Sequence, residues 1–296
     1  MRKLLKAVVK ARAVRFGAVA TLMVSAAGCG TPLLTEAGLI SRYDRLAPTE
    51  ATATKARLFV DKAALAGMRT VRIIPTSFPE AVSGSALTPR ERRLIANAAD
   101  RALCYELSLR YDVVSSGKAD LTVRSAITHV GLTDVPAAGA TIGASAAITI
   151  AAQVGAGFAE TIGRIPVPRV PIGLGDLTVE AEAVDARRQQ RAAMIWAGAA
   201  NSFTNPARFS AGSDAYDLAG DFGQDFGYLL ATGEDPLQAG PTIPTYDRIR
   251  VTMLGEAPLD PDCQVFGRAP GVDGIIGDVI GLPPDWTDKG PLDAQR

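Results

Sequence analysis

Short stretches in which apolar residues alternate with polar ones, or run together for a few positions, recur six times along the chain and predict strands. In the clearest of them, Leu177–Val184, apolar residues alternate with Thr178, Glu180 and Glu182, whose side chains we expect to point outward. A polar turn at Asp185–Arg191 follows, so this stretch and the next predict a hairpin. The six predicted strands are Arg57–Asp61, Thr70–Ile74, Asp120–Val130, Leu177–Val184, Ala192–Gly198 and Tyr246–Leu254.

Two amphipathic helices are predicted between these strands. The first begins at Thr88, because Thr88 and Glu91 have the spacing of a capping box and a proline follows the N-cap directly. Its apolar residues fill one half of the helical wheel, while Cys104 lies in the polar half. The second helix begins at Ser213 as its cap and ends near Gly233.

This order of elements predicts an α+β fold, a mixed, largely antiparallel sheet with two amphipathic helices on one face. We expect the domain to span residues 57–254 and to be followed by an irregular tail, residues 255–296, that is rich in Pro, Gly and Asp. Residues 131–175 form an insertion rich in Ala, Gly and Pro, in which residues 135–159 carry no charge. That uncharged stretch is compatible with packing on protein, with a flap touching membrane or partner, or with a weakly apolar membrane span.

The first 28 residues have the pattern of a secretory signal peptide. Six cations and no acids precede a short uncharged core, which ends in small residues and is too short to span a membrane. Residues 29–56, rich in Thr, Ala, Gly and Pro, predict a flexible tether to the folded body.

The end of this signal, Ala26-Ala27-Gly28-Cys29, resembles the lipobox of bacterial lipoproteins, although leucine is usual at the position of Ala26. The resemblance implies that Cys29 becomes the first residue of the mature chain and carries acyl chains, palmitate among them. Gly30 stands where lipoproteins kept at the inner membrane typically have Asp, which implies the periplasmic side of the outer membrane. The alternative is an ordinary cleaved signal with a coincidental cysteine.

Charge excludes one class of partner. Without residues 1–28, the chain has 25 Lys and Arg residues against 31 Asp and Glu residues, a net charge of about −6. Nucleic-acid binding requires clustered Lys and Arg, so we expect no nucleic-acid partner.

Two further cysteines, Cys104 and Cys263, remain if Cys29 is lipidated. Because the expected compartment permits disulfides, and because a tail could reach the polar side of the first helix, we predict a bridge between them. Two free thiols too far apart to meet are the alternative.

Few residues suggest chemistry. His129 is the only histidine, and we expect it half-buried on the strand face of Ile127 rather than in a metal site or catalytic triad. Glu180 and Glu182 could form an acid/base pair but lack an inferable pocket. We therefore predict no catalytic residues, no metal and no cofactor.

Three residues are candidates for partner binding. Asp221 and Asp225 repeat a negative charge at i, i+4 on the second helix, which destabilises a helix unless a cation is near. The pair is compatible with a solvated helix face, with a basic partner or an intramolecular arginine, or, least well, with a calcium site. Trp286 lies near the end of the chain and is either exposed as a partner anchor or packed back on the domain. Trp196, in a predicted strand, is expected in the core.

The lipobox, the capped helix, Glu180-Ala-Glu-Ala-Val-Asp185 and the Asp-rich second helix together resemble a bacterial envelope lipoprotein family known only as a domain of unknown function. More distantly, the chain is similar to small modules of the curli-secretion lipoprotein and of penicillin-binding-protein activators, which bind partners. The resemblance implies a non-catalytic lipoprotein that binds or positions another envelope component. The alternative is a periplasmic hydrolase that acts on cell-wall material through carboxylates. The identity of the partner and the oligomeric state are not predicted.

Overall fold

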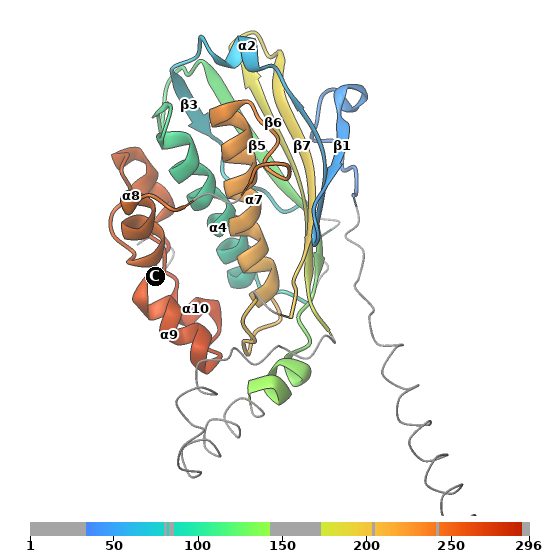
Figure 1. Ribbon diagram of the computed structural model, residues 1–296, viewed down its shortest axis with the longest axis vertical. Coiled ribbons are helices and arrows are strands. Elements are labelled where there is room, and N and C mark those ends of the chain that lie inside the picture. Colours follow the sequence, from blue (N-terminus) through green and yellow to red (C-terminus); the bar gives the residue numbers. More distant parts are fainter. Residues whose placement is uncertain are drawn as a thin grey trace, which may run out of the picture. The chain divides into compact units, whose positions relative to one another are not determined.

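The computed structural model describes residues 34–79, 82, 86–142, 173–202, 205–240 and 243–291. A mixed seven-stranded sheet forms its centre, with the strands in the order β1-β2-β7-β6-β5-β3-β4 (Figure 1). Strand β3 is parallel to β4 and β5, and the other pairs are antiparallel. The strands are β1 (Ala47–Glu50), β2 (Thr54–Val60), β3 (Thr70–Ile73), β4 (Asp112–Val113), β5 (Leu121–Gly131), β6 (Asp176–Asp185) and β7 (Gln190–Ala199).

Two long helices, α4 (Pro89–Ser108) and α7 (Ser213–Thr232), lie side by side on one face of the sheet (Figure 1). The predicted capping box is present, since the Thr88 side chain accepts from the Glu91 N–H and the Glu91 carboxylate accepts from the Thr88 N–H. Helix α7 has no side-chain cap, and its N-cap residue is Gly212 rather than Ser213. The α+β prediction is confirmed, with both helices on one face of a largely antiparallel sheet.

The core lies between this sheet face and the helix pair. Trp196 on β7 is buried there, as predicted, with its ring edge-on to Phe222 at 6.0 Å between centroids. The helices approach closely at Gly223, where a Cβ atom would lie 2.4 Å from the Ala99 carbonyl oxygen. A side chain at residue 223 would therefore push the two helices apart.

The opposite face of the sheet is covered by the N-terminal segment, residues 34–46. Ile40 and Leu46 pack there against Ala193 and Ile195 of β7. The prediction of a flexible tether over residues 29–56 is wrong for this part, because residues 34–46 are docked and residues 47–50 and 54–56 belong to strands. Thr, Ala, Gly and Pro content did not reveal the apolar and backbone contacts that hold the segment.

The C-terminal region is helical. Tyr246–Leu254 was predicted as a strand, but Thr245 caps a short helix, α8 (Tyr246–Arg248), which continues into a π-helical turn, Ile249–Met253. Only Val251 of that turn is buried, so the apolar alternation serves no sheet. The predicted irregular tail contains a 3₁₀ helix at Pro261–Phe266 and helices α9 (Val272–Ile280) and α10 (Pro284–Thr287). We call residues 246–291 the C-terminal layer, because they lie on the far side of α4 and α7 from the sheet (Figure 1).

Residues 131–175 differ in part from the prediction. Residues 135–142 are helical, and the uncharged stretch beyond residue 142 lies outside the described residues.

In strand β5, a bulge between Ile127 and His129 moves His129 to the opposite face, where it pairs with Thr178. His129 is half-buried, as predicted, but its Nε2 lies 3.0 Å from the Asp176 carboxylate rather than beside Ile127. The described part of the chain also contains a 3₁₀ helix at Tyr43–Arg45 and the short helix α2 (Lys62–Leu65). Within the described part of the chain, no helix has the length and hydropathy needed to cross a membrane.

Candidate functional site

Glu180 and Glu182, predicted to face outward, are fully buried beneath the N-terminal segment. Glu180 Oε1 accepts from the Ala37 N–H at 2.7 Å and from the Tyr43 hydroxyl at 2.8 Å, and its Oε2 accepts from the Leu39 N–H at 2.9 Å. The prediction failed because strand alternation identifies a face without identifying what covers it.

Glu182 holds the same segment one step further along the strand. Its Oε1 accepts from the Ser41 N–H at 2.9 Å, and its Oε2 accepts from Arg124, which also donates to the Leu39 carbonyl at 3.0 Å. Burial alone would raise the pKa of Glu182, but hydrogen bonds from Ser41, Arg124 and Gln190 outweigh it and leave the pKa below its ordinary value. The two carboxylates therefore bind alternate N–H groups of an extended segment of the protein itself.

Asp225 also has a partner inside the fold. Its Oδ2 accepts from the indole N–H of Trp196 at 2.7 Å, which satisfies the one polar group of that buried ring. Burial raises the pKa of Asp225 to about 6. Asp221, one turn earlier, is exposed at the edge of a smaller cleft of about 270 Å³ between α4, α7 and the C-terminal layer. Of the two predicted partner-binding aspartates, Asp221 is thus exposed, whereas Asp225 is half-buried and bonded to Trp196.

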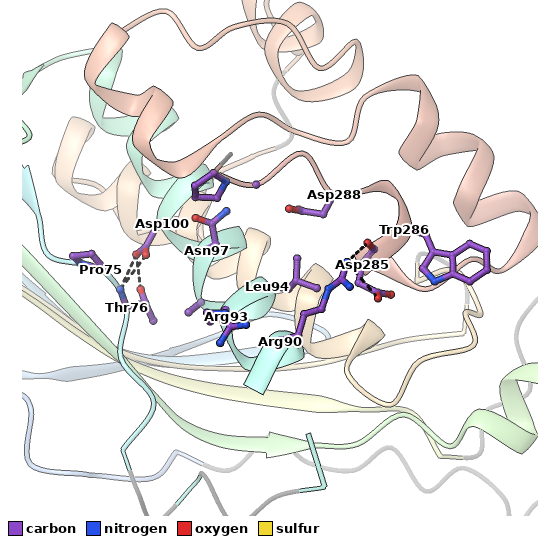
Figure 2. Close-up of a pocket in the computed structure, with 13 residues that line it drawn as sticks. Pro75, Thr76, Arg90, Arg93, Leu94, Asn97, Asp100, Asp285, Trp286 and Asp288 are labelled. Atoms are coloured by element: carbon purple, nitrogen blue, oxygen red, sulfur yellow. Dashed lines mark hydrogen bonds and ion pairs between the residues drawn. The ribbon is translucent and has the colours of Figure 1, made fainter. Parts of the chain in front are cut away.

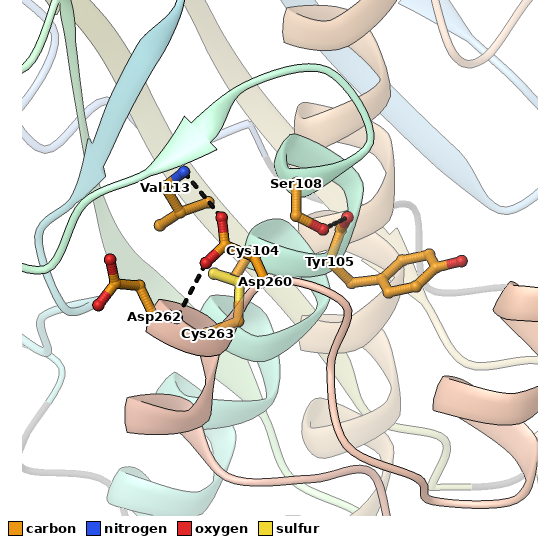
Figure 3. The surroundings of a disulfide bond; sticks show 7 residues. All are labelled: Cys104, Tyr105, Ser108, Val113, Asp260, Asp262 and Cys263. Carbon is orange, nitrogen blue, oxygen red and sulfur yellow. Dashed lines mark hydrogen bonds between the residues drawn. A yellow bond between two sulfur atoms is a disulfide. The ribbon is translucent and has the colours of Figure 1, made fainter.

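Cys104 and Cys263 form the predicted disulfide, with 5.8 Å between their Cα atoms (Figure 3). Cys104 is on the helix face away from the sheet, but it is buried because the C-terminal layer covers it. Next to the bridge, Asp260 caps the 3₁₀ helix and accepts from the Val113 N–H at 2.9 Å, which joins the layer to strand β4 (Figure 3).

Ion pairs between described residues attach the same layer at four further points, one of them between Arg90 and Asp285 at 3.7 Å. Arg101 of α4 donates to the Asp288 carboxylate at 2.9 Å, and Tyr216 of α7 donates to the same oxygen at 2.6 Å. The other two pairs join Arg248 to Glu106 at 2.6 Å and Arg208 to Asp278 at 2.5 Å. The layer is therefore held by a covalent bond, by partly desolvated charges and by Cys263 and Phe266, which are buried in the main hydrophobic core.

Helix α9 presents its apolar residues to solvent. They recur at i, i+3, i+4, i+7 and i+8, and Val279 is 78% exposed. The opposite face packs through Gly274 and Gly277, where a Cβ atom would lie 2.8 Å or less from Pro270 or Thr287. Trp286 on α10, which packs on α9, is 71% exposed. We call this surface the α9 patch; it consists of Val272, Ile275, Ile276, Val279, Ile280 and Trp286.

Sequence reasoning missed this patch, since residues 255–296 were interpreted as an irregular tail. The spacing of Val272, Ile275, Ile276, Val279 and Ile280 was the available signal. Trp286 was predicted to be either exposed or packed back on the domain, and the structure shows it exposed.

A cleft of about 740 Å³ separates the first half of α4 from the C-terminal layer (Figure 2). Four polar residues of α4 at helical spacing line one wall: Arg90, Arg93, Asn97 and Asp100. The facing wall comes from residues 285–291, and Pro75 and Thr76 close the inner end. We call this the α4 cleft, a second site that sequence reasoning did not identify.

Cys29, the proposed lipidation site, is outside the described residues. In the described part of the chain, no group of three or more His, Cys, Asp or Glu side chains is placed to hold a metal ion.

The fold and these sites define an α+β domain whose helix pair carries a disulfide-linked outer layer with an exposed apolar patch. The chain belongs to the family described as protein of unknown function (DUF3313), whose model matches residues 35–226. That match ends before the C-terminal layer begins.

Comparisons with individual proteins add little. No curated protein matches the chain. Among solved structures, the chain is similar to the PelC dodecamer from Paraburkholderia phytofirmans, with 11% identity and a TM-score of 0.33 over 64% of this chain and 99% of that one. A variant of the same PelC gives 12% identity and a TM-score of 0.32 over 63% and 98% of the two chains. At these scores we draw no functional conclusion from the likeness.

Proposed function

We propose that this protein is a lipoprotein of the outer membrane, anchored through lipid on Cys29 and facing the periplasm. Its α+β domain binds or positions another component of the cell envelope and catalyses no reaction. The lipobox resemblance supports the anchor, and Gly30 after the cysteine, where lipoproteins kept at the inner membrane typically have Asp, supports the location.

The α9 patch is the observation that carries the binding role. A stable helix normally turns its apolar stripe inward, whereas α9 turns its glycine side inward and its valine and isoleucine side chains outward. Contiguous exposed apolar surface of this kind marks interaction sites. The patch includes the exposed Trp286, and tryptophan is one of the side chains enriched among interface anchors.

The alternative of a cell-wall hydrolase loses its candidate residues. It depends on Glu180 and Glu182, and both carboxylates are engaged by the N-terminal segment.

Affinity capture from cross-linked envelopes tests the binding role. The lipidated wild type should recover a discrete envelope partner, and Val279→Glu should lose it, because a charge at the centre of the patch must be desolvated on binding. Ile243→Glu is the matched control: Ile243 is also exposed, at 93%, but belongs to no patch. Equal recovery by both variants would contradict the proposed surface.

Mass spectrometry of the mature N-terminus tests the anchor separately. The expected species begins at Cys29 and carries the mass of its acyl chains. An unmodified peptide beginning elsewhere would remove both the anchor and the proposed location.

A further inference from the structure

The α4 cleft has the size of a ligand site. Its volume of about 740 Å³ lies within the roughly 300–1,000 Å³ of typical small-molecule pockets. Apolar atoms of Pro75, Leu94 and Pro291 contribute to its lining beside the polar side chains of α4. A site of this mixed kind suits a molecule with an uncharged body and a polar end.

The carboxyl groups of the cleft each have a partner in the protein. Asp285 lies 3.7 Å from Arg90, and Asp288 lies 2.9 Å from Arg101. Asp100 is buried and accepts from the Thr76 N–H and hydroxyl (Figure 2), and burial raises the pKa of its carboxyl to about 7. Each of the three carboxyl groups thus has a cation or hydrogen-bond donor beside it, and of their buried oxygen atoms only the Oδ1 of Asp288 lacks a hydrogen-bond partner among the described residues.

Arg93 is left as the cation without a partner. It is exposed, it lines the cleft, and none of the described residues forms an ion pair or hydrogen bond with its guanidinium. Arg90 stands one turn before it on the same wall and donates to the Asp285 carbonyl at 3.0 Å (Figure 2). The wall formed by α4 therefore carries net positive charge where the cleft opens.

We propose that the α4 cleft binds a small organic anion, whose carboxylate or phosphate group is held by Arg93 with Arg90 and whose uncharged body lies against Leu94, Pro75 and Pro291. A guanidinium binds either anionic group through parallel N–H donors, so the chemistry is shared by both classes. This proposal concerns a site other than the α9 patch and is independent of the anchor at Cys29.

Titration of the mature chain, followed by NMR at the amides of residues 90–100, tests the site with defined probes. Phenylacetate and phenyl phosphate represent the two anion classes, and phenylacetamide is the neutral isostere of the first. Affinities of such small probes are on the order of 1 mM. We expect at least one anion to bind about tenfold more tightly than phenylacetamide, and the better anion identifies the class.

Variants of single arginines connect the binding to its residue. Arg93→Gln should weaken the anion about tenfold, while Arg93→Lys should retain part of the affinity because it keeps the charge. Arg187→Gln, an equal change of charge on the exposed turn between β6 and β7, should have no effect. Equal binding of phenylacetamide, absence of binding by both anions, or an undiminished affinity in Arg93→Gln would each overturn the proposal.

Discussion

Replacing Glu180 by glutamine should release the N-terminal segment from the sheet while the rest of the domain stays folded. The carboxylate accepts three hydrogen bonds, from Ala37, Leu39 and Tyr43. Glutamine has nearly the same volume but only one acceptor oxygen. Its amide N–H₂ group must therefore face at least one of the donors that the carboxylate now binds.

The size of the effect follows from these contacts. Hydrogen bonds to a charged group contribute about 1.5–3 kcal/mol each, and a donor left unpaired in a buried site costs about 1–3 kcal/mol. Losing one bond of three should therefore destabilise the docked segment by about 2 kcal/mol. Since 1.4 kcal/mol corresponds to a factor of ten, the segment should open about 30-fold more often.

Hydrogen exchange separates local release from global unfolding. The amides of Ala37, Leu39 and Ser41 should exchange about 30-fold faster in Glu180→Gln, whereas amides in the centre of β6 should change little. Glu50→Gln on the edge strand β1 is the control, because that side chain is exposed and forms no hydrogen bond or ion pair with the described residues of the segment. Unchanged protection at residues 37–41 would refute the claim that Glu180 holds the segment.

Three further perturbations test other parts of the fold. Gly223→Ala should lower the free energy of unfolding by about 1–3 kcal/mol in denaturant unfolding, because the added methyl group meets Ala99 and Ala102. Gly220 has open space around it, so Gly220→Ala should raise the free energy of unfolding by up to about 1 kcal/mol. A change of the same sign in both variants would contradict the close helix packing. Cys104→Ser should abolish the faster migration of the oxidised protein in non-reducing electrophoresis. It should also lower the free energy of unfolding by up to about 5 kcal/mol, because the two cysteines are 159 residues apart. Identical migration of wild type and variant would argue against the bridge. Folding raises the pKa of Asp100 from 3.8 to about 7, so the stability contributed by its bound proton is complete below about pH 4 and is lost as the pH rises through 7. The free energy of unfolding should therefore fall by on the order of 2 kcal/mol between pH 5 and 8. An equal fall in Asp100→Asn would exclude Asp100 as the cause.

The sequence predicted the elements whose signals are local. Thr88 and Glu91 identify the start of α4 because capping is a property of four consecutive residues. The hairpin of β6 and β7 follows from alternation on both sides of one polar turn. The disulfide could be predicted because lipidation of Cys29 would leave only two other cysteines.

Features that depend on distant segments were predicted poorly. Glu180 has the sequence pattern of a solvent-facing residue, and only the three-dimensional fold brings residues 34–46 over it. His129 changes face because of one extra residue in β5, which no periodicity reveals. The walls of the α4 cleft lie nearly two hundred residues apart in sequence, so no local pattern could have joined Arg93 to Asp285.

One wall of the α4 cleft belongs to the segment that lies outside the family match. Arg90 and Arg93 come from within residues 35–226, whereas Asp285, Trp286 and Pro291 come from beyond them. That outer wall is joined to the helix pair by the disulfide, by charged contacts and by the burial of Cys263 and Phe266, whereas all seven strands and both long helices precede it in the chain. Evolution could thereby retune what the pocket accepts while inheriting the scaffold unchanged.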